Sequence, residues 1–174
     1  EEVERRLEGI GAGTKDLLAQ AKSNPMAFND VEGMVADLVE VKVEMAPLID
    51  AALGDRAQYI VLSGQRTLRS IANGSLRLRG RVGLISVAML SASRYPLDQQ
   101  LSQEQHVIGH ATQFIQVASN WEDLAWQLLG TTWFVSTIET ALLLREKYKQ
   151  QPWRFVTPSA EVLEADGTLF GGPR

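Results

Sequence analysis

The stretch AALGDRAQYIV, residues 51–61, contains the structural step on which this chain is built: the end of a helix, a glycine and a short strand. Apolar residues from Met45 to Leu53 recur at the i, i+3, i+4, i+7 spacing of an amphipathic helix, and Gly54 stands where a helix-ending glycine belongs. Residues 59–62 favour a buried strand. The stretch LLGTTWFV, residues 128–135, has the same order, so we predict two lobes of related architecture.

Helices and strands alternate on both sides of the first stretch. We predict a strand over residues 34–41 before it. After it, Leu68, Ile71 and Ala72 indicate a helix that ends at Gly74, and residues 82–87 form a third strand. This β-α-β-α-β order favours parallel strands with helices packed on the sheet.

The second half of the chain has a similar order, with strands predicted at 114–117, 133–135 and 155–157. Asn120 is expected to cap a helix that ends at Leu129. Ser136 and Glu139 are expected to form a capping box for a helix that runs to about Lys149. Asp166-Gly167 predicts the turn of a hairpin between residues 161–163 and 168–170. The prediction is therefore a mixed α/β (α+β) fold of two small lobes, each with a β-α-β-α-β pattern.

Breaks in the pattern divide the chain into four expected segments. Residues 1–30 contain a charged helix end at Glu1–Glu8 and a short helix at 14–21, residues 31–90 form lobe I, and residues 107–174 form lobe II with a terminal strand. The polar segment 91–106, which contains Pro96, is expected to be a linker. Because the chain begins with Glu1 and not with Met, we expect it to be a piece cut from a longer protein.

The composition is that of an ordinary globular domain, with 174 residues of which 45% are hydrophobic and 22% charged. The absence of cysteine excludes thiolate zinc sites, iron–sulfur clusters and disulfides. The longest stretch without a charged side chain, residues 105–121, is too polar for a membrane span, so we expect no membrane partner.

Charge is spread unevenly along the chain. A net charge of −4 argues against a dedicated nucleic-acid binder, yet residues 56–97 contain seven arginines and neither an acid nor a lysine. Such a segment can bind phosphate or an acidic partner surface. The alternative is a solvated face that balances acidic residues elsewhere in the fold.

No sequence motif indicates a catalytic or cofactor-binding site. The stretch GIGAGTK, residues 9–15, has Gly-Thr-Lys where a phosphate loop needs Gly-Lys-Ser/Thr. His106 and His110 would share a helix face and could bind a metal, but Val107 stands where the zinc-protease motif has its glutamate. No Gly-x-Ser-x-Gly elbow is present. We therefore predict an interaction domain with no catalytic residue, no metal and no cofactor.

Several runs, taken in order, resemble the hinge domain of structural maintenance of chromosomes (SMC) proteins, of the bacterial type. LEGIGAGTK (7–15) resembles the point where the coiled-coil arm meets the hinge, VEGMVADL (31–38) the first hinge strand, and GRVGLI (80–85) a strand usually written Gly-Arg-Ala-Thr-Phe-Leu. Residues 51–61 and 128–135 resemble the helix-to-strand steps of the two lobes, and 154–172 the glycine-rich close. The chain departs from the family pattern in the linker, residues 89–105, and at Asp166-Gly167, where bacterial members often have a glycine pair.

The resemblance implies a domain that assembles as a ring-like homodimer and joins two coiled-coil arms of a chromosome condensation and segregation ATPase. That protein would be cytoplasmic and associated with the nucleoid, and its ATPase would lie in head domains outside this chain, so we expect no enzyme here. The terminal strand would present an unpaired edge to a partner. The implied interface residues are Gly167, Thr168, Leu169, Phe170, Gly171 and Gly172.

The resemblance also implies weak, sequence-independent DNA binding. The candidate residues here are Arg77, Arg79, Arg81, Lys147 and Lys149. Two other interpretations stay open: a small-ligand or nucleotide-binding α/β domain of a larger enzyme, and a docking domain of some other coiled-coil ATPase. The first would need a pocket with converging polar groups at the ends of strands.

Overall fold

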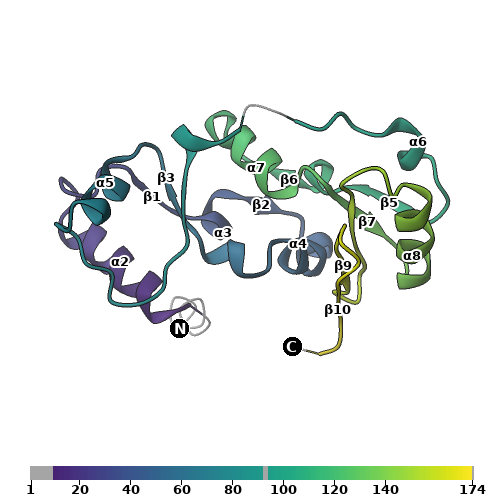
Figure 1. Cartoon of the computed structure of the whole chain (residues 1–174), viewed down its shortest axis with the longest axis horizontal. Helices are drawn as coiled ribbons and strands as arrows, with labels where there is room; N and C mark the ends of the chain where they lie inside the picture. The colour runs from purple at the N-terminus through teal and green to yellow at the C-terminus, as the bar shows by residue number, and fades with distance from the viewer. Residues whose placement is uncertain (1–9, 92–93, 174) are drawn as a thin grey trace. The chain divides into compact units, whose positions relative to one another are not determined.

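The computed structural model describes residues 10–91 and 94–173 (Figure 1). The helix end predicted at Glu1–Glu8 lies outside the described residues. The described residues divide into two compact units: unit 1 draws on residues 10–38 and 55–91, and unit 2 on residues 39–54 and 94–173. This grouping differs from the contiguous lobes 31–90 and 107–174 of the sequence analysis, because residues 39–54 pack with unit 2. No described helix is both long enough and apolar enough to cross a membrane.

Unit 1 is built around a small three-stranded sheet. Its elements are α2 (Ala12–Ser23), β1 (Val31–Met34), α3 (Val35–Leu38), the 3-10 turn η2 (Gly54–Gln58), β3 (Ile60–Leu62), α5 (Arg66–Ala72), β4 (Leu84–Ser86) and the 3-10 turn η3 (Val87–Met89). The strand order is β1-β3-β4, with β1 antiparallel and β4 parallel to β3. The core joins Leu17 of α2 to Ile60 and Leu62 of β3 and to Leu76.

A close backbone approach in unit 1 explains the first glycine-rich stretch. A Cβ placed on Gly13 would lie 2.7 Å from the carbonyl carbon and oxygen of Gly80, whereas one on Gly11 would meet nothing within 4 Å. Gly13 is buried inside α2. Glycine is therefore needed at residue 13 for packing of α2 against the chain at Gly80.

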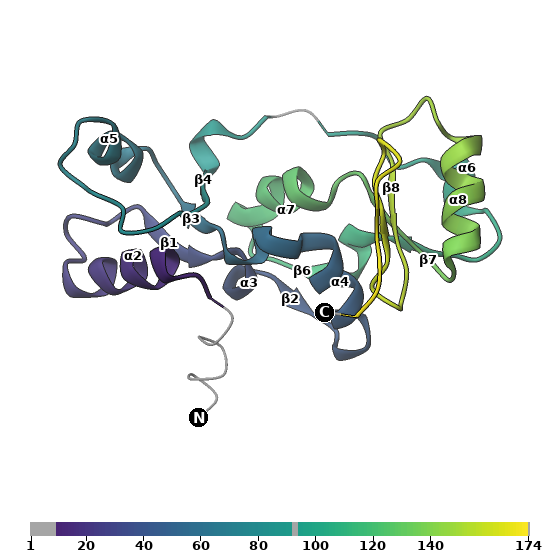
Figure 2. The ribbon, with the colours of Figure 1, turned by 60° about the horizontal axis from the view of Figure 1, so that its bottom comes forward.

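Unit 2 contains a five-stranded sheet in the order β10-β9-β8-β7-β5. Its elements are β2 (Glu40–Val41), η1 (Val43–Met45), α4 (Ala46–Leu53), α6 (Gln99–Ser102), β5 (Val107–His110), η4 (Ala111–Phe114), β6 (Ile115–Gln116), η5 (Ser119–Trp121), α7 (Glu122–Leu129), β7 (Thr132–Val135), α8 (Ile138–Lys147), β8 (Arg154–Val156), β9 (Val162–Leu163) and β10 (Leu169–Phe170). Only β7 and β8 run parallel within this sheet, and β2 pairs separately with β6. Both views place α8 on one side of the β9–β10 hairpin and α4 on the other (Figures 1 and 2).

Each unit therefore contains one parallel β-α-β step, β3-α5-β4 in unit 1 and β7-α8-β8 in unit 2. The predicted strand at 34–41 is wrong: the strand is Val31–Met34, and it is antiparallel to β3. The strand runs antiparallel because α4, expected as the crossover helix of lobe I, contacts α7 and β8 of unit 2 instead. Without a crossover helix on its own sheet, β1 is not constrained to run parallel.

Several predicted boundaries shift by a few residues. The strand expected at 114–117 is shortened to β6, because residues 111–114 form a 3-10 turn. Trp121, and not Asn120, is the N-cap of α7. The capping box expected from Ser136 and Glu139 is wrong, because Thr137 caps α8 by accepting a hydrogen bond from the Thr140 backbone N–H. The predicted hairpin and the strand at 133–135 are confirmed.

Candidate functional site

The hairpin β9–β10 forms one edge of the unit 2 sheet. Leu169 and Phe170 of β10 pair with Leu163 and Val162 of β9, and no described strand pairs with the outer side of β10. Leu169 is 50% exposed and Phe170 is 59% exposed. An open strand edge that carries two exposed apolar side chains is suited to adding a strand from another chain.

The fold requires glycine at some positions of this segment and not at others. Gly167 lies in the hairpin turn with φ of 93°, and a Cβ there would come within 3.2 Å of the Arg145 guanidinium, so the turn itself favours glycine. A Cβ on Gly171 would meet only the Glu161 side chain, at 4.0 Å, and one on Gly172 would meet nothing within 4 Å. Packing within the described chain therefore does not require glycine at residue 171 or 172, although Gly172 has a φ of 93°.

Thr168 completes the turn. Its backbone N–H donates to Asp166 Oδ1 at 2.9 Å, and its carbonyl accepts from the Glu164 N–H at 2.8 Å. The bond from Thr168 lowers the pKa of the Asp166 carboxyl, and the charge of Arg145 acts in the same direction. The turn is thus held by local bonds, which leaves the outer edge of β10 free to bind.

The sequence analysis missed the role of α8 beside this hairpin. Arg145 Nη2 donates to the carbonyl oxygen of Ala165 at 3.2 Å, which fixes the hairpin turn to the helix. Leu142 and Leu143 of the same helix are 53% and 73% exposed. The helical spacing of Ala141 and Leu144, both buried, was the signal that would have assigned Leu142 and Leu143 to the outer side.

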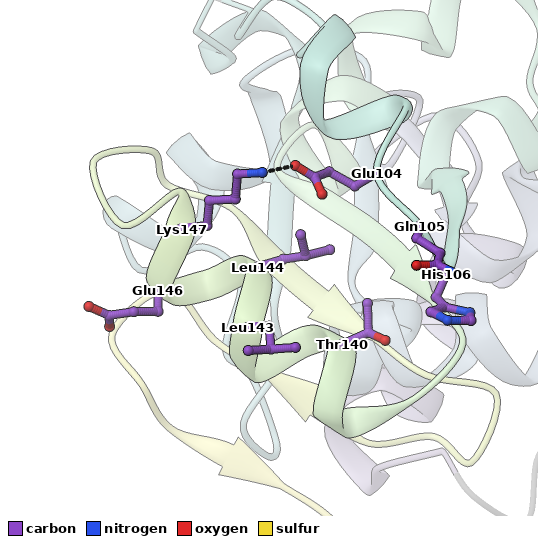
Figure 3. Close-up of a pocket in the computed structure, with 8 residues that line it drawn as sticks. All are labelled: Glu104, Gln105, His106, Thr140, Leu143, Leu144, Glu146 and Lys147. Carbon is purple, nitrogen blue, oxygen red and sulfur yellow. Dashed lines mark hydrogen bonds and ion pairs between the residues drawn. The ribbon is translucent and has the colours of Figure 1, made fainter.

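A shallow pocket of about 490 Å³ lies on the flank of α8 away from Arg145 and the hairpin turn (Figure 3). Its lining residues are Glu104, Gln105, His106, Thr140, Leu143, Leu144, Glu146 and Lys147. Glu104 accepts hydrogen bonds from Lys147 Nζ and from the Tyr148 hydroxyl. These bonds lower the pKa of Glu104, while burial and the neighbouring carboxylate raise the pKa of Tyr148 to about 12. Two of the charged groups of the pocket, Glu104 and Lys147, are therefore paired with each other.

The two histidines do not share a helix face. His106 is exposed with φ of 69°, whereas His110 is buried in β5. His110 Nε2 donates to the Gly130 carbonyl at 2.9 Å, its ring stacks on Trp126 with centroids 5.2 Å apart, and burial lowers its pKa. Across residues 10–91 and 94–173 no group of three His, Asp or Glu side chains is placed to hold a metal ion. The metal alternative weighed for this histidine pair is thus not supported by its geometry.

The candidate DNA-binding residues fall in both units. Arg77, Arg79 and Arg81 are exposed in the unit 1 segment between α5 and β4. Arg79 forms a 3.7 Å ion pair with Asp16, but neither Arg77 nor Arg81 pairs with a carboxylate in the described part of the chain.

Both candidate lysines lie in unit 2 and are already paired. Lys147 pairs with Glu104, and Lys149 pairs with Glu146 at 3.2 Å. Of the five candidate residues, Arg77 and Arg81 are therefore the two with no carboxylate partner among the described residues.

The fold defines a two-unit α/β domain with an open sheet edge, and comparison with known proteins identifies its family. The sequence model for the "SMC proteins Flexible Hinge Domain" matches residues 28–145. The chain belongs to this family of SMC hinge domains.

Relatives and solved structures agree with this assignment. The chain is 38% identical to the chromosome partition protein Smc of Rhodopirellula baltica over 99% of its length, and 27% identical to that of Lactiplantibacillus plantarum over 98%. It spans 14% of the length of each of these relatives.

The fold is similar to that of the Geobacillus stearothermophilus SMC hinge domain, whose crystal structure is described as an asymmetric dimer. The TM-score is 0.80 at 20% identity, with 99% of this chain and 70% of the other covered. The Pyrococcus furiosus SMC hinge domain gives a TM-score of 0.69 at 22% identity, with 98% and 84% covered. The α/β hinge fold expected from the sequence is thereby confirmed.

Proposed function

We propose that this chain is the dimerisation hinge of a chromosome partition ATPase, in which two copies associate and so join two coiled-coil arms. The observation that carries the proposal is the open edge of β10, where Leu169 and Phe170 are half exposed at the end of the unit 2 sheet. Pairing of this edge with a partner strand would satisfy its free backbone groups and cover both side chains.

Gly171, the first residue after β10, supports the same interpretation. Because a side chain at Gly171 would fit the isolated chain, a glycine there is better explained by close approach of a partner backbone. The interface residues Gly167 to Gly172 form one continuous segment, in which Gly167 and Thr168 also shape the turn.

The proposed domain has no catalytic role and needs no cofactor. The ATPase would reside in other parts of the parent protein, and the dimer would act in the cytoplasm on nucleoid DNA. Two copies related by twofold symmetry would each contribute the same edge, so every interface contact would occur twice.

Sedimentation equilibrium of the 174-residue chain over a micromolar concentration series tests the proposal. We expect a dimer for the parent chain and a folded monomer for Gly171→Glu, since the new carboxylate would be buried between the two copies. Ala165→Glu adds the same charge in the exposed hairpin turn and should stay dimeric. A parent chain that is monomeric at high micromolar concentration would overturn the proposal.

We also propose weak DNA binding by the unit 1 segment, supported by the exposed guanidinium groups of Arg77 and Arg81 that have no acidic partner among the described residues. Such binding would depend strongly on salt and not on sequence. Fluorescence anisotropy with a labelled duplex at low salt should show weaker binding for the Arg77→Glu/Arg81→Glu variant than for Lys149→Glu, whose lysine is already paired. Equal binding by the two variants would contradict this assignment.

A further inference from the structure

The pairing of β10 determines which side of the sheet each of its exposed residues faces. Leu169 lies directly opposite Leu163, and Phe170 lies opposite Val162. Side chains directly opposite each other in an antiparallel pair share a face of the sheet. Leu163 belongs to the core cluster that contains Ala141 and Leu144 of α8. Leu169 is therefore on the α8 side of the sheet, and Phe170 is on the opposite side.

Leu142 lies on the flank of α8 that faces the same hairpin. It precedes Arg145 by one helical turn, and Arg145 reaches the Ala165 carbonyl in the hairpin turn. Both ribbon views show α8 on one side of the hairpin, and α8 contacts β9 (Figures 1 and 2). Leu143 follows Leu142 by about 100° around the helix and lines the pocket on the other flank instead. The two neighbouring leucines thus belong to different surfaces.

We propose that Leu142 and Leu169 form one apolar surface, the α8–β10 surface, which a second copy of this chain covers. Leu142 is 53% exposed and Leu169 is 50% exposed, so both are half covered by their own unit and half available to a partner. This inference rests on the proposed dimerisation and extends its interface from the strand edge to a helix face.

Charge supports a second copy as the occupant. The α8–β10 surface is bordered by exposed acids, Glu139 on α8 and Asp166 in the hairpin turn. The same chain contains a segment of opposite charge, residues 56–97, with seven arginines and no acid. Within that segment Met89 is a largely exposed apolar side chain, and it lies outside the stretch that contains the candidate DNA-binding residues Arg77 and Arg81. A copy of this chain can therefore supply an apolar group for the centre and cations for the rim.

The two adjacent leucines provide a matched experiment on the 174-residue chain. Sedimentation equilibrium should show that Leu142→Glu raises the dimer dissociation constant by at least about tenfold, because it places a carboxylate in the covered surface. Leu143→Glu changes a more exposed leucine of the same helix and should leave the constant within about twofold of the parent value. Far-ultraviolet circular dichroism checks that both variants fold, and Leu142→Gln, expected to weaken association less, replaces Leu142→Glu if that variant does not fold.

The outcomes separate this inference from the proposed function. If Leu142→Glu, or Leu142→Gln in its place, dimerises like the parent while Gly171→Glu is monomeric, the edge is the interface and the α8–β10 surface is wrong. Equal weakening by Leu142→Glu and Leu143→Glu would also overturn the assignment to one flank. If the parent itself is monomeric at high micromolar concentration, the dimerisation proposal fails and this inference fails with it.

Discussion

Arg154 donates two hydrogen bonds to one oxygen of Glu164, from Nε at 3.1 Å and from Nη2 at 2.7 Å. Its remaining nitrogen, Nη1, donates to the carbonyl of Ala52 at 2.7 Å and to Thr132 Oγ1 at 3.2 Å. One mostly buried guanidinium thus links β8 to the segment after β9, to β7 and to the last turn of α4. These contacts position the hairpin whose outer strand is the candidate interface.

We expect Arg154→Lys to lower the free energy of unfolding by about 2–3 kcal/mol, because an ammonium cannot reproduce the planar fork of donors. Chemical denaturation followed by circular dichroism measures the change. Lys149→Gln removes an exposed pair with Glu146 and should cost less than about 1 kcal/mol. Equal stability of Arg154→Lys and the parent would show that the four bonds contribute little.

The contact between Gly13 and Gly80 predicts a second stability difference. Gly13→Ala should destabilise the chain by roughly 1–3 kcal/mol, because its Cβ would meet rigid backbone at 2.7 Å. Gly11→Ala, two residues earlier and open to space, should cost less than about 1 kcal/mol. Thermal unfolding of the two variants side by side checks the prediction. A more stable Gly13→Ala would mean that helix propensity outweighs the clash.

His110 predicts a pH dependence of stability. Burial lowers the pKa of His110 in the folded chain below the ordinary histidine value of 6.5, so the unfolded chain binds more protons at mildly acid pH. The contribution is fully present above pH 6.5 and is lost as the pH falls from there toward the lowered folded pKa. Denaturation at several pH values between 5 and 8 should therefore show a steeper acid loss for the parent than for His110→Gln. Parallel curves would contradict this role for the buried imidazole.

Much of the local structure could be predicted because it depends on neighbouring residues. The glycine steps after α4 and α7, the strand Thr132–Val135 and the hairpin turn at Asp166-Gly167 all follow from short-range spacing and turn chemistry. The direction of β1 could not be predicted, because it depends on where α4 packs. The position of α4 depends on residues far along the chain, such as Arg154, whose side chain donates a hydrogen bond to the Ala52 carbonyl.

The candidate site was predicted only in part. The terminal segment was found from its glycines and from the family resemblance, and the structure adds that Leu169 and Phe170 face opposite sides of the sheet. The flank of α8 was missed, although the helical phase of Leu142 was present in the sequence. The sequence could not show that this flank faces the hairpin, because that depends on the long-range hydrogen bond between Arg145 and Ala165.

The placement of residues 39–54 in unit 2 has a consequence for anyone who wishes to express the halves of this domain separately. A truncation that starts after residue 91 would remove β2 and α4, so that β6 would lose its strand partner and Arg154 its acceptor on Ala52. The two units therefore cannot be obtained as autonomous fragments by a single cut of the gene.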